Sequence, residues 1–134
     1  MQKILILFDY LYYRLGRLYF KTEGKGTLLP VYIVALSQLL IFMDIYFCIH
    51  SLIYGVSSDR NFVHQHFQLI VTFDIITFIL LTIGNYRKYK NKYELFLEKW
   101  QGESRPLRIV RGIIIFLFLI FITFFTGIVT KLIN

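Results

Sequence analysis

Three long apolar segments dominate this chain and restrict it to a narrow set of folds: residues 28–54, 67–84 and 112–133. A helix of about twenty apolar residues crosses the roughly 30 Å hydrocarbon core of a bilayer. The last segment has no charged side chain before Lys131. Hydrophobic residues make up 57% of the chain and charged residues only 17%, too few to cover a soluble domain of this size. The sequence therefore predicts an all-α membrane protein with three transmembrane helices.

Basic residues gather at alternate ends of these segments. Thirteen of the fifteen lysines and arginines precede the first segment or lie between the second and the third. Because positively charged loops stay on the cytoplasmic side, we predict a cytoplasmic N-terminus, an external loop at 55–66, a basic cytoplasmic loop at 85–111 and an external C-terminus. No nucleic-acid-binding motif organises the charges. We therefore expect anionic lipid headgroups as partners and no nucleic acid.

Residues 3–21 predict an amphipathic helix that lies in the membrane interface. Apolar residues recur at steps of three and four on one face, and basic residues occupy the other. On this interpretation Arg14 and Arg17 face lipid phosphates or a partner. The apolar face consists of Ile4, Leu7, Phe8, Leu11, Leu15 and Leu18, and the opposite face carries Lys3, Tyr10, Arg14, Arg17 and Lys21.

The basic loop at 85–111 contains a stripe of aromatic residues at helical spacing. We expect the second transmembrane helix to continue into the cytoplasm along this stripe until Gly102 and Pro106 end it. Two interpretations stay open: the stripe packs against the N-terminal helix as a small cytoplasmic cap, or it docks a lipid or protein partner. The stripe comprises Tyr86, Tyr89, Tyr93, Phe96 and Trp100, of which Tyr86 and Tyr89 are candidate anchors at headgroup level.

Two motifs in these regions resemble a loose group of small bacterial membrane proteins. The first is Phe8-Asp9-Tyr10 followed by Tyr12-Tyr13-Arg14, and the second is Asn85-Tyr86-Arg87-Lys88-Tyr89 followed by Lys92-Tyr93 and Trp100. The resemblance covers the N-terminal helix and the basic loop. It implies a bacterial inner membrane, and because the group carries no assigned activity it implies no reaction.

Two carboxylates, Asp44 and Asp74, lie inside the first and second apolar segments. An ionisable group at membrane depth costs about 3 kcal/mol or more, so such residues face protein or water. Antiparallel helices would place them about 15 Å and 10 Å from the external helix ends. Three interpretations stay open: hydrogen bonds between helices, a cation or proton pathway in a homo-oligomer, or recognition of a partner's membrane helix. The polar residues around them that complete a candidate pathway are Gln38, His50 and Thr77.

No catalytic constellation is present in the sequence. A Walker A loop, a Gly-x-Ser-x-Gly elbow and a His-Glu-x-x-His helix are all missing. The pair His64 and His66 lacks an evident third ligand, so we predict no metal site, no cofactor and no enzymatic activity.

The third apolar segment carries a pattern for close helix packing. Thr123, Gly127 and Thr130 contribute to the spacing of small residues that lets helix backbones approach closely. We therefore predict a non-enzymatic inner-membrane protein that acts through helix–helix contacts with a partner, as an accessory subunit or an immunity-type protein. The alternative is a homo-oligomeric cation or proton channel that uses Asp44 and Asp74, as the membrane effector of a defence or stress system would.

Overall fold

The computed structural model describes the backbone of residues 2–24 and 27–133, and their side chains except at 2–5, 56–61, 63–64, 123 and 126–133. Over these residues the chain is all-helical, as predicted, and has no strand. The helices in chain order are α1 (Gln2–Thr22), α2 (Leu29–Tyr54), α3 (Val56–Tyr89), α4 (Tyr93–Trp100) and α5 (Arg105–Ile133).

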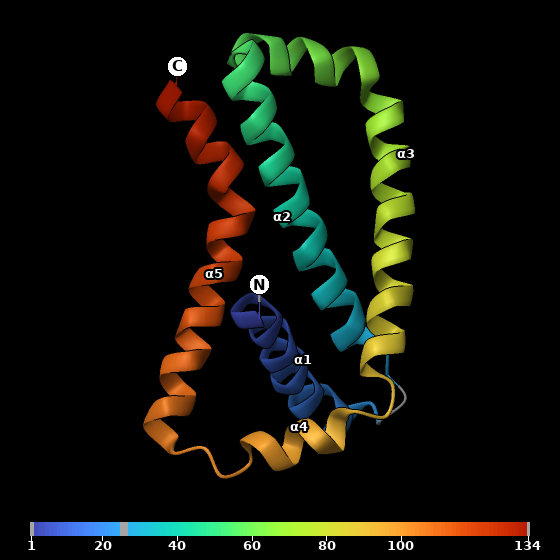
Figure 1. Ribbon diagram of the computed structural model, residues 1–134, viewed down its shortest axis with the longest axis vertical. Coiled ribbons are helices and arrows are strands. Elements are labelled where there is room, and N and C mark those ends of the chain that lie inside the picture. Colours follow the sequence, from blue (N-terminus) through green and yellow to red (C-terminus); the bar gives the residue numbers. More distant parts are fainter. Residues whose placement is uncertain (1, 25–26, 134) are drawn as a thin grey trace.

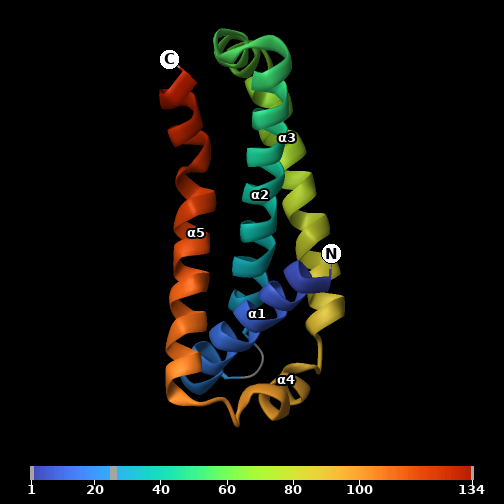
Figure 2. The ribbon, with the colours of Figure 1, turned by 60° about the vertical axis from the view of Figure 1, so that its left-hand side comes forward.

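The three long helices run along the long axis of the molecule, with α3 antiparallel to α2 and α5 (Figure 1). Helix α2 packs against α3, α5 and α1, and α1 also packs against α4. The two shorter helices, α1 and α4, lie at the end where α2 begins, α3 ends and α5 begins (Figure 2). The fold is therefore a three-helix body with a helical cap at one end.

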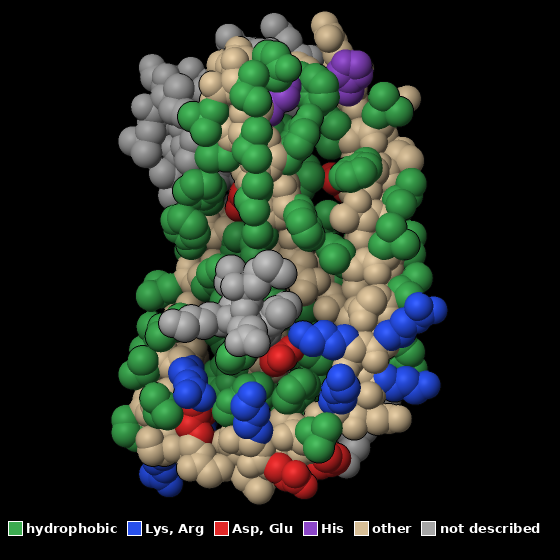
Figure 3. All heavy atoms as spheres, viewed as in Figure 1, with side chains coloured by type: hydrophobic (Ala, Val, Ile, Leu, Met, Phe, Trp, Pro, Cys, Tyr) green, Lys and Arg blue, Asp and Glu red, His purple; other side chains and the backbone are tan. Residues whose placement is uncertain are grey.

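The long helices present apolar side chains to the outside. Helix α2 and the part of α3 from Gln65 to Tyr89 are long and apolar enough to cross a membrane. Only 17% and 0% of the residues in their most apolar stretches, respectively, are buried. A core helix of a soluble protein would bury such residues. On the face shown in Figure 3, hydrophobic side chains cover the long helices and most lysines and arginines lie at the capped end.

Two helices of the described part of the chain thus qualify as membrane spans. The third predicted span, residues 112–133, falls within α5. The structure describes the side chains of this segment only at 112–122, 124 and 125, so its role as a span stays a prediction.

The connection at 55–66 is helical and not the predicted loop, because α3 begins at Val56, and its external position stays a prediction. Gly55 adopts a positive φ of 81°, a conformation that glycine tolerates at little cost, and this one residue separates α2 from α3. A second break occurs at His66, where φ is −115° and ψ is 19°. The first part of α3 consequently runs across from the end of α2 to the rest of α3 (Figure 1).

The predicted continuous helix through Trp100 is also wrong. Helix α3 ends at Tyr89, and Asn91 adopts a φ of 59°, which asparagine tolerates better than most residues. The chain therefore turns, and α4 runs back across α1. The predicted stop before residue 106 is confirmed, since α4 ends at Trp100. Helix α5 then begins at Arg105, with Pro106 in its first turn, where the missing N–H costs nothing.

Candidate functional site

Helices α1 and α4 and the end of α3 enclose a cluster of rings, the aromatic cap. The rings of Tyr12 and Tyr89 stack with centroids 4.3 Å apart and 7° between their planes. The Trp100 ring lies 5.3 Å from the rings of Tyr10, Tyr13 and Phe96. The predicted packing of the aromatic stripe against the N-terminal helix is confirmed. The members of the cap are Tyr10, Tyr12, Tyr13, Phe20, Tyr89, Tyr93, Phe96 and Trp100.

The cap changes which stripe residues can face lipid or a partner. Tyr89 is 1% exposed and Trp100 is 6% exposed, so neither is available to an outside molecule in this structure. Tyr93, at the start of α4, is half-buried and its ring contacts the rings of Tyr13 and Phe20 of α1. Only Tyr86 remains exposed among the tyrosines of the stripe, with the Lys90 ammonium 5.8 Å from its ring centroid. The periodicity located the stripe correctly but did not show that protein would cover it.

The two predicted faces of the N-terminal helix are partly wrong. Tyr10, expected on the polar face, is 4% exposed, and Phe8 and Leu11, expected on the lipid-facing apolar side, are 5% and 3% exposed because protein covers them. Leu18 of the same apolar side is 65% exposed, as the prediction requires. Trp100 of α4 lies against the Tyr10 ring, with centroids 5.3 Å apart, and the Tyr10 hydroxyl donates to Glu103. Arg14 and Arg17 are half-buried, and the Arg14 guanidinium packs against α5, so closely that a Cβ added at Gly112 would lie 3.2 Å from Arg14 Nη2.

A buried carboxylate supports the cap where α4 joins α5. The Glu103 side chain is 3% exposed, and its Oε1 lies 2.8 Å from Arg111 Nη1. Its Oε2 accepts a hydrogen bond of 2.7 Å from the Tyr10 hydroxyl. Burial, together with this bond to a carboxylate, raises the pKa of Tyr10 to about 12. The phenol therefore stays protonated and donates to Glu103 throughout the physiological pH range.

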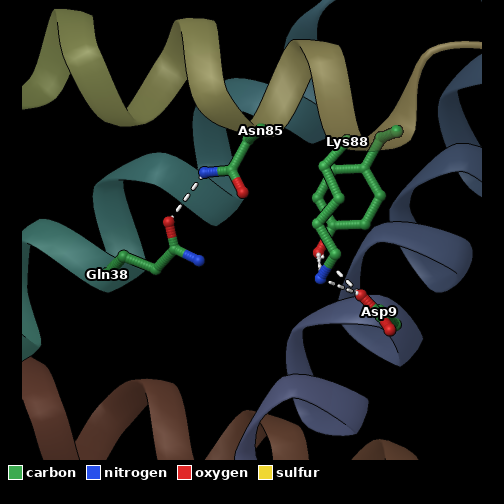
Figure 4. A network of polar contacts seen from close by, with 5 residues as sticks. Asp9, Gln38, Asn85 and Lys88 are labelled. Atoms are coloured by element: carbon green, nitrogen blue, oxygen red, sulfur yellow. Dashed lines mark hydrogen bonds and ion pairs between the residues drawn. The ribbon is translucent and has the colours of Figure 1, made fainter.

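A second polar contact connects α1 to α3 (Figure 4). Asp9 Oδ1 lies 2.5 Å from Lys88 Nζ and accepts a hydrogen bond of 3.0 Å from the Tyr89 hydroxyl. The side chains of Lys88 and Asp9 are 36% and 21% exposed. The pair therefore orients α1 on α3 more than it stabilises the fold, because partly exposed ion pairs contribute about 1 kcal/mol or less.

Gln38, a predicted pathway residue, instead forms a hydrogen bond between the long helices. Asn85 Nδ2 donates to Gln38 Oε1 over 2.7 Å (Figure 4), and Asn85 is 6% exposed. This amide pair joins α2 to α3 close to the cap. The sequence analysis did not identify Asn85 as the partner, because only the antiparallel register of the two helices reveals it.

Asp74 lines an open cavity between α2 and α3, the α2–α3 groove. The groove has a volume of about 640 Å³. Asp74 Oδ1 is buried and has no hydrogen-bond partner among the described residues. Thr77 lies on the same wall, so these two predicted site residues are together. The lining residues are Leu39, Phe42, Met43 and Tyr46 of α2 and Phe62, His66, Leu69, Ile70, Phe73, Asp74 and Thr77 of α3.

Asp44 does not line this groove, although it is only 8% exposed. Successive residues of an α-helix are rotated by about 100°, which places Asp44 roughly opposite the α2 residues of the groove. The structure thus separates the two carboxylates rather than bringing them to one cavity. His50 lies elsewhere, in a group of rings near the α2–α3 connection, 4.8 Å from the Tyr54 ring and 4.9 Å from the Phe62 ring.

Some predicted residues lie outside the described side chains: Thr123, Gly127, Thr130 and His64. Among the side chains that are described, no three histidine, cysteine, aspartate or glutamate residues gather as a metal site would require.

Comparison with protein-family models, curated proteins and solved structures finds no match to this chain. The geometry alone therefore defines the class: a helical protein with an apolar three-helix body and a polar and aromatic cap.

Proposed function

We propose that this chain is a multi-pass protein of a bacterial inner membrane, with α2, the Gln65–Tyr89 part of α3, and α5 as its three spans. The supporting observation is the outward orientation of the apolar side chains on the long helices. The cap and most of the basic residues lie at one end, which the bias of basic loops assigns to the cytoplasm. The N-terminus is then cytoplasmic and the C-terminus is external.

A reporter enzyme fused after Asn134 tests this topology. We expect a fused alkaline phosphatase to be active and a fused green fluorescent protein to be dark, because only the phosphatase matures outside the cytoplasm. A matched pair of fusions at Gly102, in the basic loop, should give the reverse result. Fluorescence from the Asn134 fusion would contradict the three-span arrangement.

The function that we infer is non-enzymatic contact with another membrane protein through exposed helix faces. The observation that carries this proposal is the apolar surface of α3, where Ile76, Leu80 and Ile83 are 52%, 64% and 45% exposed. In a membrane, lipid or another helix covers such a surface, and packing plus interhelical hydrogen bonds favour the helix. An accessory subunit or an immunity-type protein would use the surface in this way.

Purification in a mild detergent from the native membrane tests the inferred contact. We expect a second membrane protein to co-purify in a fixed stoichiometry, and Leu80→Trp to reduce its recovery severalfold because the larger side chain disrupts close packing. The matched control is Leu95→Trp, an equally exposed leucine on α4, which should leave recovery unchanged. Isolation of the wild-type protein as a lone monomer would contradict the proposal.

A homo-oligomeric cation or proton channel is the alternative function, and the structure favours it less. A shared pathway needs both carboxylates at one axis, whereas Asp74 lines the α2–α3 groove and Asp44 lies on another face of α2. Gln38, the third candidate of that pathway, is engaged with Asn85.

A further inference from the structure

The α2–α3 groove has the size and chemistry of a ligand site. Its volume of about 640 Å³ falls within the roughly 300–1,000 Å³ of small-molecule pockets. Such pockets combine apolar walls with a few polar groups that orient the ligand. Here the walls are leucine, isoleucine, methionine and aromatic side chains, and the polar groups include Asp74 and Thr77.

Asp74 is the acidic side chain of this lining, and one of its oxygens needs a partner. Asp74 Oδ1 is shielded from solvent and receives no hydrogen bond from the described residues. A carboxylate among apolar side chains is unfavourable unless a cation or a hydrogen-bond donor compensates it. Neither a lipid acyl chain nor an apolar helix face can supply such a group.

Four aromatic residues surround the same space. Phe42 and Tyr46 extend from α2, and Phe62 and Phe73 extend from α3. Aromatic faces attract cations, and they do so most strongly where water is displaced. The carboxylate and the rings therefore select the same ligand property, a positive charge on an apolar body.

We propose that the α2–α3 groove binds a hydrophobic organic cation, with Asp74 as its counter-ion and the four aromatic rings around its apolar part. The proposal depends on the groove alone and not on the inferred membrane partner. The two proposals can therefore fail separately.

Equilibrium dialysis of the purified full-length protein in detergent, with tetraphenylphosphonium as the probe, tests this site. At pH 8 we expect saturable binding to the wild type. Asp74→Asn keeps the shape of the side chain and removes its charge, so its affinity should fall about tenfold or more. The matched control Asp44→Asn, which changes a carboxylate outside the groove, should alter affinity by less than about twofold.

Two further measurements separate a specific site from general charge or an unfolded variant. Tetraphenylborate has the same shape and the opposite charge, so it should not displace the bound cation. Met43→Trp fills the groove and leaves Asp74 in place, and it should also abolish binding while helicity and elution volume stay unchanged. Absence of saturable wild-type binding, or equal losses in Asp74→Asn and Asp44→Asn, would overturn the proposal.

Discussion

Replacing Trp100 by alanine should release α4 and α1 from each other and expose the end of the molecule. The indole is 6% exposed and contacts the rings of Tyr10, Tyr13 and Phe96. Removing a buried tryptophan or phenylalanine side chain costs about 3–5 kcal/mol through lost burial and the remaining cavity. We therefore expect the free energy that opposes opening of the cap to fall by about this amount.

Hydrogen exchange followed by mass spectrometry measures this change directly. Backbone amides of α1 and α4 should exchange about a hundredfold faster or more in Trp100→Ala, as a loss of about 3 kcal/mol implies. The amides of α2 should change little, because α2 contributes no ring to the aromatic cap. Leu95→Ala, on the same helix but 61% exposed, is the matched control and should leave exchange within about twofold of the wild type. Equal exchange in Trp100→Ala and wild type would show that the cap does not hold the two helices together.

Gly16→Leu should open the same cap from the side of α1. A Cβ atom added at Gly16 would lie 2.8 Å from Tyr93 Cε2 and 2.9 Å from Phe20 Cε2. Both rings belong to the aromatic cap, so neither can move aside without disturbing its neighbours. Overpacking of this kind costs about 1–3 kcal/mol, and leucine should reach the upper end because it adds three carbons beyond Cβ.

The single tryptophan provides the measurement for this variant. Opening of the cap moves Trp100 from an apolar to an aqueous environment, so we expect its emission to shift to longer wavelength in Gly16→Leu. Gly84→Ala is the control, since a Cβ added at Gly84 in α3 meets no atom within 4 Å. That variant should be stabilised by up to about 1 kcal/mol, the difference between alanine and glycine in a helix. An unchanged emission spectrum in Gly16→Leu would contradict the close packing of α1 on α4.

Most of the helices that the sequence pattern predicted are present in the structure. The apolar run at 28–54 became α2, and the amphipathic pattern at 3–21 became α1. These elements depend on local properties, namely apolar length and spacing by three and four, which can be read from the chain without knowing its neighbours. The aromatic stripe was recognised for the same reason, and its packing against α1 was one of the two interpretations that the sequence left open.

The wrong predictions concern how the helices are connected and which side chains the protein buries. Positive φ values at Gly55 and Asn91 produced sharp turns where the sequence suggested a loop and a continuous helix. Tyr10 is buried against Trp100 and donates a hydrogen bond to Glu103, which are 90 and 93 residues away along the chain. Contacts between residues so distant in the chain leave no periodic signal, so sequence patterns could not reveal them.

By itself, the amino-acid sequence determined that the chain forms long apolar helices, that its positive charge gathers at one end, and that two carboxylates lie within the apolar segments. Helix geometry and side-chain polarity are sufficient for those conclusions. Only the tertiary structure decided that Asp74 lines the α2–α3 groove while Asp44 lies on another face, and that Tyr89 and Trp100 face inward. The physical reason is that helix packing and two tight turns set the relative rotation of the helices, and this rotation determines which side chains meet.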